Sequence, residues 1–309
     1  MTAPYGYYPG CSMRGTGVAY EESLLTLFRK LDVPLQELPD WNCCGAASYM
    51  GIDERLAFLL SARNLARAHR AGFTDLVTPC SACYLGLRKT QDYAARYPSY
   101  RSLTVVAQNA SPGRDRQGAD AQLLAAVRVR HPLDVLYVDV GLERLRSAVA
   151  RRWRGGRVAC YYGCQLVRPY GEVDRPHDPS RMDELLRAVG VPTVDFALKT
   201  KCCGGSLTGT IHPVGVRLNY ILLKEAARKG AEAIATVCPL CQYNLDVYQN
   251  EIRRGASDAI DMPILFFTQI LGWALGCDPD SLGLRRAISG RRSIAEWFTR
   301  RREEVESYV

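Results

Sequence analysis

The sequence predicts an α/β protein made of two similar lobes, and three observations support this fold class. A pattern of one Cys, then Cys-Cys-Gly, then Cys-x-x-Cys occurs twice and takes up ten of the twelve cysteines. Matching cysteines in the two halves lie 153 to 159 residues apart, which indicates an internal duplication. Short apolar stretches lead into the motifs and amphipathic stretches separate them, as expected of α/β units.

In the first half, helices and strands alternate around the cysteine motifs. Apolar residues recur at helical spacing over 18–31 and 54–71, and Gly72 follows the second helix as a stop signal. Each gap between motifs has room for one helix and one strand. The predicted strands are 4–8, 35–38 and 75–78.

The second half repeats this order. Helices are predicted over 181–189 and 213–229, and they end at Gly190 and Gly230. The predicted strands are 157–161, 193–196 and 233–237.

The segment between the halves predicts a boundary near residue 155. Residues 110–120 are a polar loop with Gly and Pro, and 133–152 read as a linking helix that ends before Gly155-Gly156. A length of 309 residues suits two domains, which we place at 1–155 and 156–309.

The repeated cysteines form two sets of five thiols, each drawn from three separate loops. We call them the first set and the second set; they are Cys11, Cys43, Cys44, Cys80 and Cys83, and Cys164, Cys202, Cys203, Cys238 and Cys241. Disulfides, zinc, an iron–sulfur site or a catalytic dithiol could each use such a set. Residues 1–8 show no secretory signal, which argues for a reducing compartment and against disulfides. Structural zinc and cubane clusters each take four thiolates, so the fifth cysteine indicates a spare thiol or a cluster of unusual shape.

Glycines beside the thiols fit metal ligation. Adjacent cysteines in an extended strand point to opposite faces, so a Cys-Cys pair can face one centre only where the chain turns. Gly45 and Gly204-Gly205 supply that freedom, and Gly10 and Gly163 directly precede the first thiol of each set.

Longer motifs around these cysteines resemble a known family. They are Tyr7-Tyr8-Pro9-Gly10-Cys11-Ser12, Asp40-Trp41-Asn42-Cys43-Cys44-Gly45-Ala46, Pro79-Cys80-Ser81-Ala82-Cys83-Tyr84, Tyr161-Tyr162-Gly163-Cys164, Cys202-Cys203-Gly204-Gly205 and Cys238-Pro239-Leu240-Cys241-Gln242. The chain resembles the cysteine-rich (CCG) family typified by the B subunit of heterodisulfide reductase. The resemblance runs over nearly the whole chain, including 262–264 and 268–272.

The resemblance implies two pseudo-symmetric, Rossmann-like α/β lobes with clusters at the loop ends between them. It implies that the first set and the second set each hold one noncubane 4Fe-4S cluster. In the family the two clusters face a common cavity, where a disulfide is split one electron at a time. The same chemistry run backwards would oxidise thiols.

Two departures from the family pattern concern protons and electrons. Relatives often have His after the first cysteine of the second set, whereas Gln165 stands here and cannot act as an acid in the same way. The four-cysteine run of bacterial ferredoxins is absent from the sequence. Electrons are therefore expected from other subunits, namely a ferredoxin-like iron–sulfur subunit similar to the C subunit of heterodisulfide reductase, and a flavin subunit.

Three functions remain open from the sequence. The leading hypothesis is a catalytic subunit that reduces a small disulfide or oxidises thiols. The second is a CCG subunit of a succinate or fumarate oxidoreductase that exchanges electrons with a quinone. The third is a non-enzymatic scaffold stapled by metal, with zinc in one set.

Composition and hydropathy indicate the size of the core and where in the cell the protein is expected. A hydrophobic content of 47% supports a sizeable core, and the apolar stretch 263–276 is only 14 residues long, too short to span a bilayer. We therefore expect a cytoplasmic protein with no transmembrane helix of its own, attached to a membrane, if at all, through its complex. The segment 265–275 could lie against a bilayer, but a core position is favoured.

The net charge of +8 comes without a nucleic-acid motif, so no nucleic-acid partner is expected. Solvated helix faces over 144–154 and 285–302 are the simplest explanation of the charge, and docking to an acidic redox partner is the alternative.

Five basic residues near the cysteine loops are candidates for contact with a cluster or with an anionic substrate. Arg14, Arg88, Arg168, Lys199 and Lys201 lie near the cysteine loops, where a cation could raise a cluster's potential or hold an anionic substrate.

The remaining cysteines, histidines and Trp41 are expected to be structural. Cys160 reads as a buried small side chain and Cys277 as a free thiol. His69 and His131 are expected in solvent, and His212 at a helix start. Trp41 is expected to be a packing residue.

Overall fold

The computed structural model describes residues 4–46, 48–109, 121–153, 155–255 and 260–286. Within these ranges the strands form two four-stranded sheets, ordered β2-β1-β3-β4 and β6-β5-β7-β8, with every neighbouring pair parallel. The predicted two-lobed α/β fold class is confirmed. The strands are β1 (Tyr5–Tyr7), β2 (Leu35–Glu37), β3 (Asp75–Val77), β4 (Arg128–Arg130), β5 (Val158–Tyr161), β6 (Thr193–Val194), β7 (Ala233–Thr236) and β8 (Ile264–Phe266).

The helices of the first lobe cover its sheet and include both predicted helices to within one residue. A side-chain cap starts one of them, because Asp53 Oδ1 accepts the Leu56 N–H at 2.9 Å. The helices are η1 (Cys11–Arg14), α1 (Val18–Lys30), α2 (Ser48–Ile52), α3 (Glu54–Arg70), α4 (Ser81–Arg96), α5 (Pro98–Asn109) and α6 (Ala121–Ala125).

The second lobe contains both predicted helices of that half, again to within one residue. Its central strands β5 and β7 are buried along their whole length, as parallel strands covered on both faces should be. The helices are α9 (Arg181–Ala188), α10 (Leu207–Thr210), α11 (His212–Arg228), α12 (Pro239–Val247), α13 (Gln249–Gly255), α14 (Phe267–Ala274), η3 (Pro279–Leu282) and η4 (Leu284–Arg286).

The linking helix predicted over 133–152 is wrong, because the segment is broken. It consists of α7 (Pro132–Val135), a π-helical turn η2 (Leu136–Val140) and α8 (Leu142–Ser147). Gly141, with φ +79°, separates η2 from α8, and this conformation ends a right-handed helix. The polar loop 110–120 and most of 285–302 lie outside the described residues.

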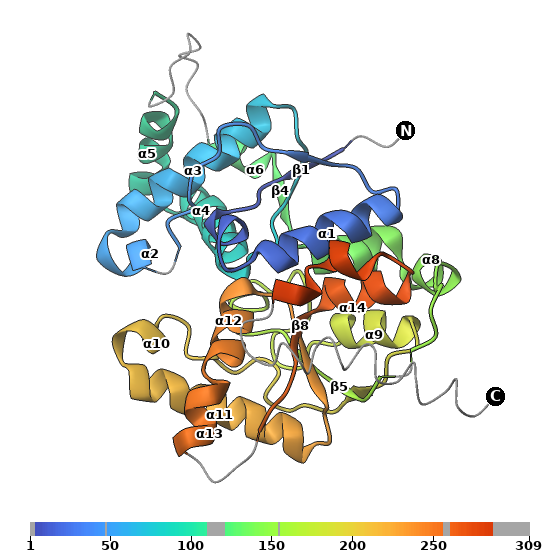
Figure 1. Ribbon diagram of the computed structural model, residues 1–309. Coiled ribbons are helices and arrows are strands. Elements are labelled where there is room, and N and C mark those ends of the chain that lie inside the picture. Colours follow the sequence, from blue (N-terminus) through green and yellow to red (C-terminus); the bar gives the residue numbers. More distant parts are fainter. Residues whose placement is uncertain (1–3, 47, 110–120, 154, 256–259, 287–309) are drawn as a thin grey trace, which may run out of the picture.

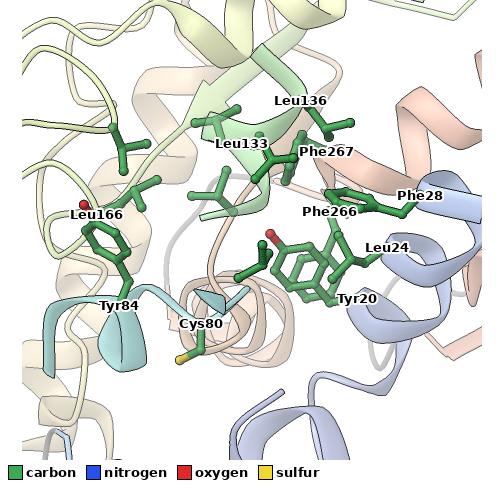
Figure 2. Packing of buried hydrophobic residues seen from close by; sticks show 14 of the residues in the cluster. Tyr20, Leu24, Phe28, Cys80, Tyr84, Leu133, Leu136, Leu166, Phe266 and Phe267 are labelled. Carbon is green, nitrogen blue, oxygen red and sulfur yellow. The ribbon is translucent and has the colours of Figure 1, made fainter. Parts of the chain in front are cut away.

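The two lobes share one hydrophobic core near α1. Helix α14 packs between α1 and α9, so the end of the described chain lies against the first lobe (Figure 1). Tyr20 stacks on Phe266 with ring centroids 4.4 Å apart, and the Ser23 and Thr268 hydroxyls lie 2.7 Å apart. Figure 2 shows this contact between α1 and the β8–α14 segment.

The apolar stretch 265–275 is therefore mainly core, since Phe267, Ile270 and Leu271 are fully buried within it. No helix in the described ranges is long and apolar enough to cross a bilayer.

Candidate metal centre

The parallel strands bring the cysteine loops of each lobe to one edge of its sheet. Strand β1 runs into η1, which begins with Cys11, and β2 leads to the Cys43-Cys44 turn. Strand β3 delivers Cys80 as the N-cap of α4. Because the carboxyl ends of parallel strands share an edge, the thiols converge there.

Thiols of the first set approach one another in pairs. The sulfur atoms of Cys11 and Cys43 are 3.9 Å apart, and those of Cys44 and Cys83 are 3.3 Å apart. The Cys11 and Cys44 thiols lower the pKa of Cys43 to about 2 through hydrogen bonds to its sulfur. A lowered pKa favours the thiolate, which is the form of cysteine that ligates metals.

The second set repeats this arrangement. The sulfur atoms of Cys203 and Cys241 lie 3.5 Å apart. Hydrogen bonds from Cys164 and then Cys203 lower the pKa of Cys202 to about 2, as happens at Cys43. The two lobes thus present matching thiol pairs at matching strand ends.

The two sets meet at Cys80 and Cys238. A hydrogen bond to the Cys238 sulfur is the main cause that raises the pKa of the Cys80 thiol. Both side chains are buried, and each is the first cysteine of its Cys-x-x-Cys motif. The preceding carbonyls, of Pro79 and Val237, lie 3.1 and 3.3 Å from the same atom, His131 Nε2, so the lobes bring the two sets close together at these thiols.

The Cys-Cys turns depend on glycine in both lobes. Gly45 and Gly204 have φ of +72° and +92°, and a Cβ at either would lie 3.0 Å from the Cα of Ala57 or Gly215. The turn expected from the Cys-Cys-Gly sequence is present in both lobes, and a neighbouring helix closes tightly over it.

A buried tyrosine supports each Cys-Cys turn, a feature that the sequence analysis missed. The Tyr8 hydroxyl donates to the Asn42 carbonyl at 2.8 Å, and the Tyr161 hydroxyl donates to the Lys201 carbonyl at 2.6 Å. Each acceptor directly precedes the cysteine pair. The signal in the sequence is a Tyr three residues before the first cysteine of each set.

One contact to a sulfur atom distinguishes the second lobe. Asn244 Nδ2 lies 3.5 Å from Cys203 Sγ, 3.3 Å from the Cys203 carbonyl and 3.0 Å from the Gly205 carbonyl. The matching position in the first lobe is Gly86, and there the Ser61 hydroxyl donates to the Cys44 carbonyl at 2.8 Å. The sulfur contact of Asn244 has no counterpart at Gly86, which has no side chain.

The cysteine-rich domain model of the CCG family matches residues 5–88 and 158–246, more than half of the chain. The chain belongs to the cysteine-rich CCG family. Both matches contain a full five-cysteine set.

Relatives of this CCG chain are reductase subunits. It is 27% identical over 290 residues to the 8-methylmenaquinol:fumarate reductase membrane anchor subunit of Wolinella succinogenes, covering 93% of this chain and 98% of that one. It is 27% identical over 302 residues to the B subunit of the ferredoxin/F(420)H(2)-dependent CoB-CoM heterodisulfide reductase of Methanosarcina acetivorans, covering 96% and 97%. A protein of Archaeoglobus profundus that is like the heterodisulfide reductase B subunit is 27% identical over 90% of this chain and 92% of its own. These relatives support a redox subunit role.

A crystal structure of a hypothetical protein from Helicobacter pylori has the same fold as this CCG chain. The TM-score is 0.65 at 14% identity, over 91% of this chain. The match spans 51% of the Helicobacter chain.

The donor chemistry of the CCG chain fits iron–sulfur groups. Each lobe offers five thiols, and the hydroxyl of Ser81, which follows Cys80, is buried with no hydrogen-bond partner among the described residues. Such a donor suits an acceptor bound beside the thiols. Within the described ranges, no three His, Cys, Asp or Glu side chains converge closely enough to hold a single metal ion.

The thiols differ in exposure, which gives the sets an open side. Cys11 and Cys202 are exposed, Cys43 and Cys164 are half-buried, and the other ligand candidates are buried. Each set therefore reaches from the protein interior to the surface.

Four of the five basic residues near the cysteine loops are held by protein groups. Arg14 pairs with Glu21 and Glu37 at 2.9 and 2.7 Å. The others pair as Arg88 with Glu172, Arg168 with the Thr200 carbonyl, and Lys199 with Asp178 and Asp183. Lys201 is exposed beside the exposed Cys202, so it is the best placed of the five to meet an anionic substrate.

Among the histidines, the expectation for His131 is wrong. His131 is fully buried between the lobes, because it caps α7 and contacts two backbone carbonyls. His69 is exposed and His212 begins α11, as expected.

The other individual expectations agree with the structure. Cys160 is buried in β5, and Cys277 is a buried free thiol. Trp41 packs edge-on against Tyr8 with ring centroids 5.7 Å apart. Gln165 is half-buried beside Cys164.

Proposed function

We propose that this chain is the iron–sulfur subunit of a heterodisulfide reductase-like complex. The first set and the second set would each hold one noncubane 4Fe-4S cluster through their five cysteines. Such clusters, when bound, supply one-electron transfer. Support comes from the two matching sets, from membership of the CCG family and from the heterodisulfide reductase relatives.

The observation that carries this proposal is that the two sets come close together where the lobes meet. The Pro79 and Val237 carbonyls, which directly precede Cys80 and Cys238, lie 3.1 and 3.3 Å from the same atom, His131 Nε2. Reducing one disulfide to two thiols requires two electrons and two protons. Two one-electron sites that lie close together could deliver both electrons to one bound disulfide, and the reverse reaction would oxidise two thiols. A single isolated set would not provide this pair of electrons at one place.

The exposed side of the sets suits substrate entry. Cys11 and Cys202 lie at the surface, and Lys201, the exposed residue directly before Cys202, would attract an anionic disulfide. Because the chain has no ferredoxin motif, a ferredoxin-like iron–sulfur subunit and a flavin subunit would exchange electrons with it.

A second candidate is electron exchange with a quinone in a fumarate or succinate oxidoreductase. The menaquinol:fumarate reductase relative, which the chain matches over 98% of its length, favours it. Exposed aliphatic residues shortly after each Cys-Cys turn also favour it, namely Ile52 and Leu56, and Ile211 and Val214. In this case the chain would associate with a membrane through its complex.

The first experiment measures iron, acid-labile sulfide and zinc on protein purified without oxygen, followed by a redox titration. About eight irons with equal sulfide per chain support two four-iron clusters. Zinc in place of iron, with failed reconstitution, would sink the redox proposal and leave a metal-stapled scaffold. Disulfides and quinones are then supplied in turn to the loaded and reduced complex. Oxidation by one class only separates the two candidates.

A further inference from the structure

His131 lies where the two lobes meet, between the innermost cysteine motifs. Its Nε2 atom is 3.1 Å from the Pro79 carbonyl oxygen and 3.3 Å from the Val237 carbonyl oxygen. These residues occupy matching positions, because each directly precedes the first cysteine of a Cys-x-x-Cys motif. One imidazole therefore joins the two strand ends that deliver Cys80 and Cys238.

The tautomer of His131 follows from its other nitrogen. The Leu133 N–H donates to Nδ1 at 3.2 Å, so Nε2 carries the proton and donates to both carbonyls. Burial lowers the pKa of His131 to about 4, and the ring is neutral near pH 7. The neutral Nε2–H group therefore gives the buried Pro79 and Val237 carbonyls a hydrogen-bond donor without placing a charge between the lobes.

The ring is held by the connector between the lobes. His131 is the N-cap of α7, and Leu133 and Leu136 of the same segment are fully buried. Figure 2 shows these two leucines in the same cluster as Cys80 and Tyr84. The Tyr84 ring meets the imidazole edge-on, with centroids 6.5 Å apart. The imidazole is therefore packed in place on several sides.

We infer that His131 is a positioning residue that sets the separation of Cys80 and Cys238, and with it the electronic coupling between the groups held by the two sets. The coupling part rests on the proposed function, because it requires both sets to be loaded. Without the Nε2 donor, two buried carbonyls from different lobes lose their shared partner. The loop ends that carry Cys80 and Cys238 would then separate.

The test compares H131L, which removes the donor, with H131Q, which places an amide N–H₂ near the position of Nε2. The readout is the magnetic interaction between the two clusters in partly reduced protein, followed by electron paramagnetic resonance. We expect H131L to keep its iron and lose much of this interaction, and H131Q to restore it. L133A is the matched control, because it weakens packing on the same helix and keeps the backbone N–H that orients His131.

An H131L variant with wild-type iron content and wild-type magnetic interaction would overturn the inference. So would a loss of interaction in L133A equal to that in H131L, since packing alone would then explain it.

If H131L takes up no iron, the closeness of Cys80 to Cys238 is tested on iron-free full-length protein. Mild oxidation followed by peptide mass spectrometry gives the yield of the Cys80–Cys238 cross-link. We expect a lower yield in H131L than in wild type and H131Q, and an equal yield would refute the positioning role. Wild-type protein without iron would defeat the proposed function, while this cross-link would still test His131.

Discussion

Gly10 lies so close to Cys83 that a Cβ at Gly10 would stand 2.8 Å from the Cys83 sulfur. Gly10 also has φ +73° and ψ 166°, a conformation open almost only to glycine. The second lobe repeats this relationship, because a Cβ at Gly163 would stand 3.1 Å from the Cys241 sulfur. In both lobes the backbone before the first thiol therefore closes directly over the last thiol.

Replacing Gly10 with alanine should cost the first set its iron and leave the second set loaded. The backbone strain alone should lower the free energy of unfolding by about 1–3 kcal/mol. Iron analysis and spectra on G10A measure the effect, and G163A should show the reverse selectivity. G72A is the control, because Gly72 has φ +79° with no neighbour within 4 Å. Full iron content in G10A would contradict this prediction.

The hydroxyl groups of Tyr8 and Tyr161 should contribute unequally to the free energy of unfolding. In the first lobe Asn64 Nδ2 also donates to the Asn42 carbonyl, at 2.8 Å, whereas the Lys201 carbonyl has only Tyr161 among the hydrogen bonds of the described residues. Y161F should therefore lower the free energy of unfolding by about 1–3 kcal/mol, and Y8F should lower it by less. Denaturant unfolding of the two iron-free variants measures the difference. An equal decrease in the free energy of unfolding in Y161F and Y8F would contradict this prediction.

Asn244 should raise the reduction potential of the second set relative to the first. An N–H aimed at a ligand sulfur stabilises the added negative charge of the reduced state. N244A should shift the midpoint of one centre to a more negative potential in a spectroscopic redox titration. The control is S61A, which removes a donor to the Cys44 carbonyl and not to a sulfur. Unchanged midpoints in N244A would exclude this role.

Acid should destabilise the protein partly through His131. Its pKa is about 4 in the folded chain against an ordinary value of 6.5, so protonation favours the unfolded chain. This contribution is fully present above pH 6.5 and is lost as the pH falls through 4. The difference corresponds to ~3 kcal/mol. Unfolding of iron-free wild type and H131Q at several pH values tests it, because glutamine does not titrate. Identical pH dependence of the two proteins would disprove it.

Lys201 should act on substrate affinity rather than on metal content. K201M should raise the Michaelis constant for an anionic disulfide several-fold, with iron content near wild type. K229M is the control, since Lys229 follows α11 at the opposite edge of the sheet from the cysteines. An unchanged Michaelis constant in K201M would remove Lys201 from the site.

The cysteine sets, six strands and four helices could be predicted from the sequence, because these signals are local, whereas helices such as α4, α5 and α12 were not predicted. Helical spacing of apolar residues placed α1, α3, α9 and α11 to within one residue. Two strands were missed for identifiable reasons. Strand β4 is Arg-Val-Arg, and the buried Arg130 is neutralised by Asp134 and Asp139. Strand β8 lies in a continuous apolar stretch, where strand and helix patterns look alike.

The sequence by itself therefore determined the α/β class, the matching strands of the two lobes and the five thiols that follow these strands in each lobe. Only the tertiary structure decided how the lobes meet. The approach of the Cys80 and Cys238 loops, the packing of α14 on α1 and the burial of His131 all join residues far apart in the chain. No local pattern encodes them. They follow from joint burial of apolar surface and from pairing backbone carbonyls away from water.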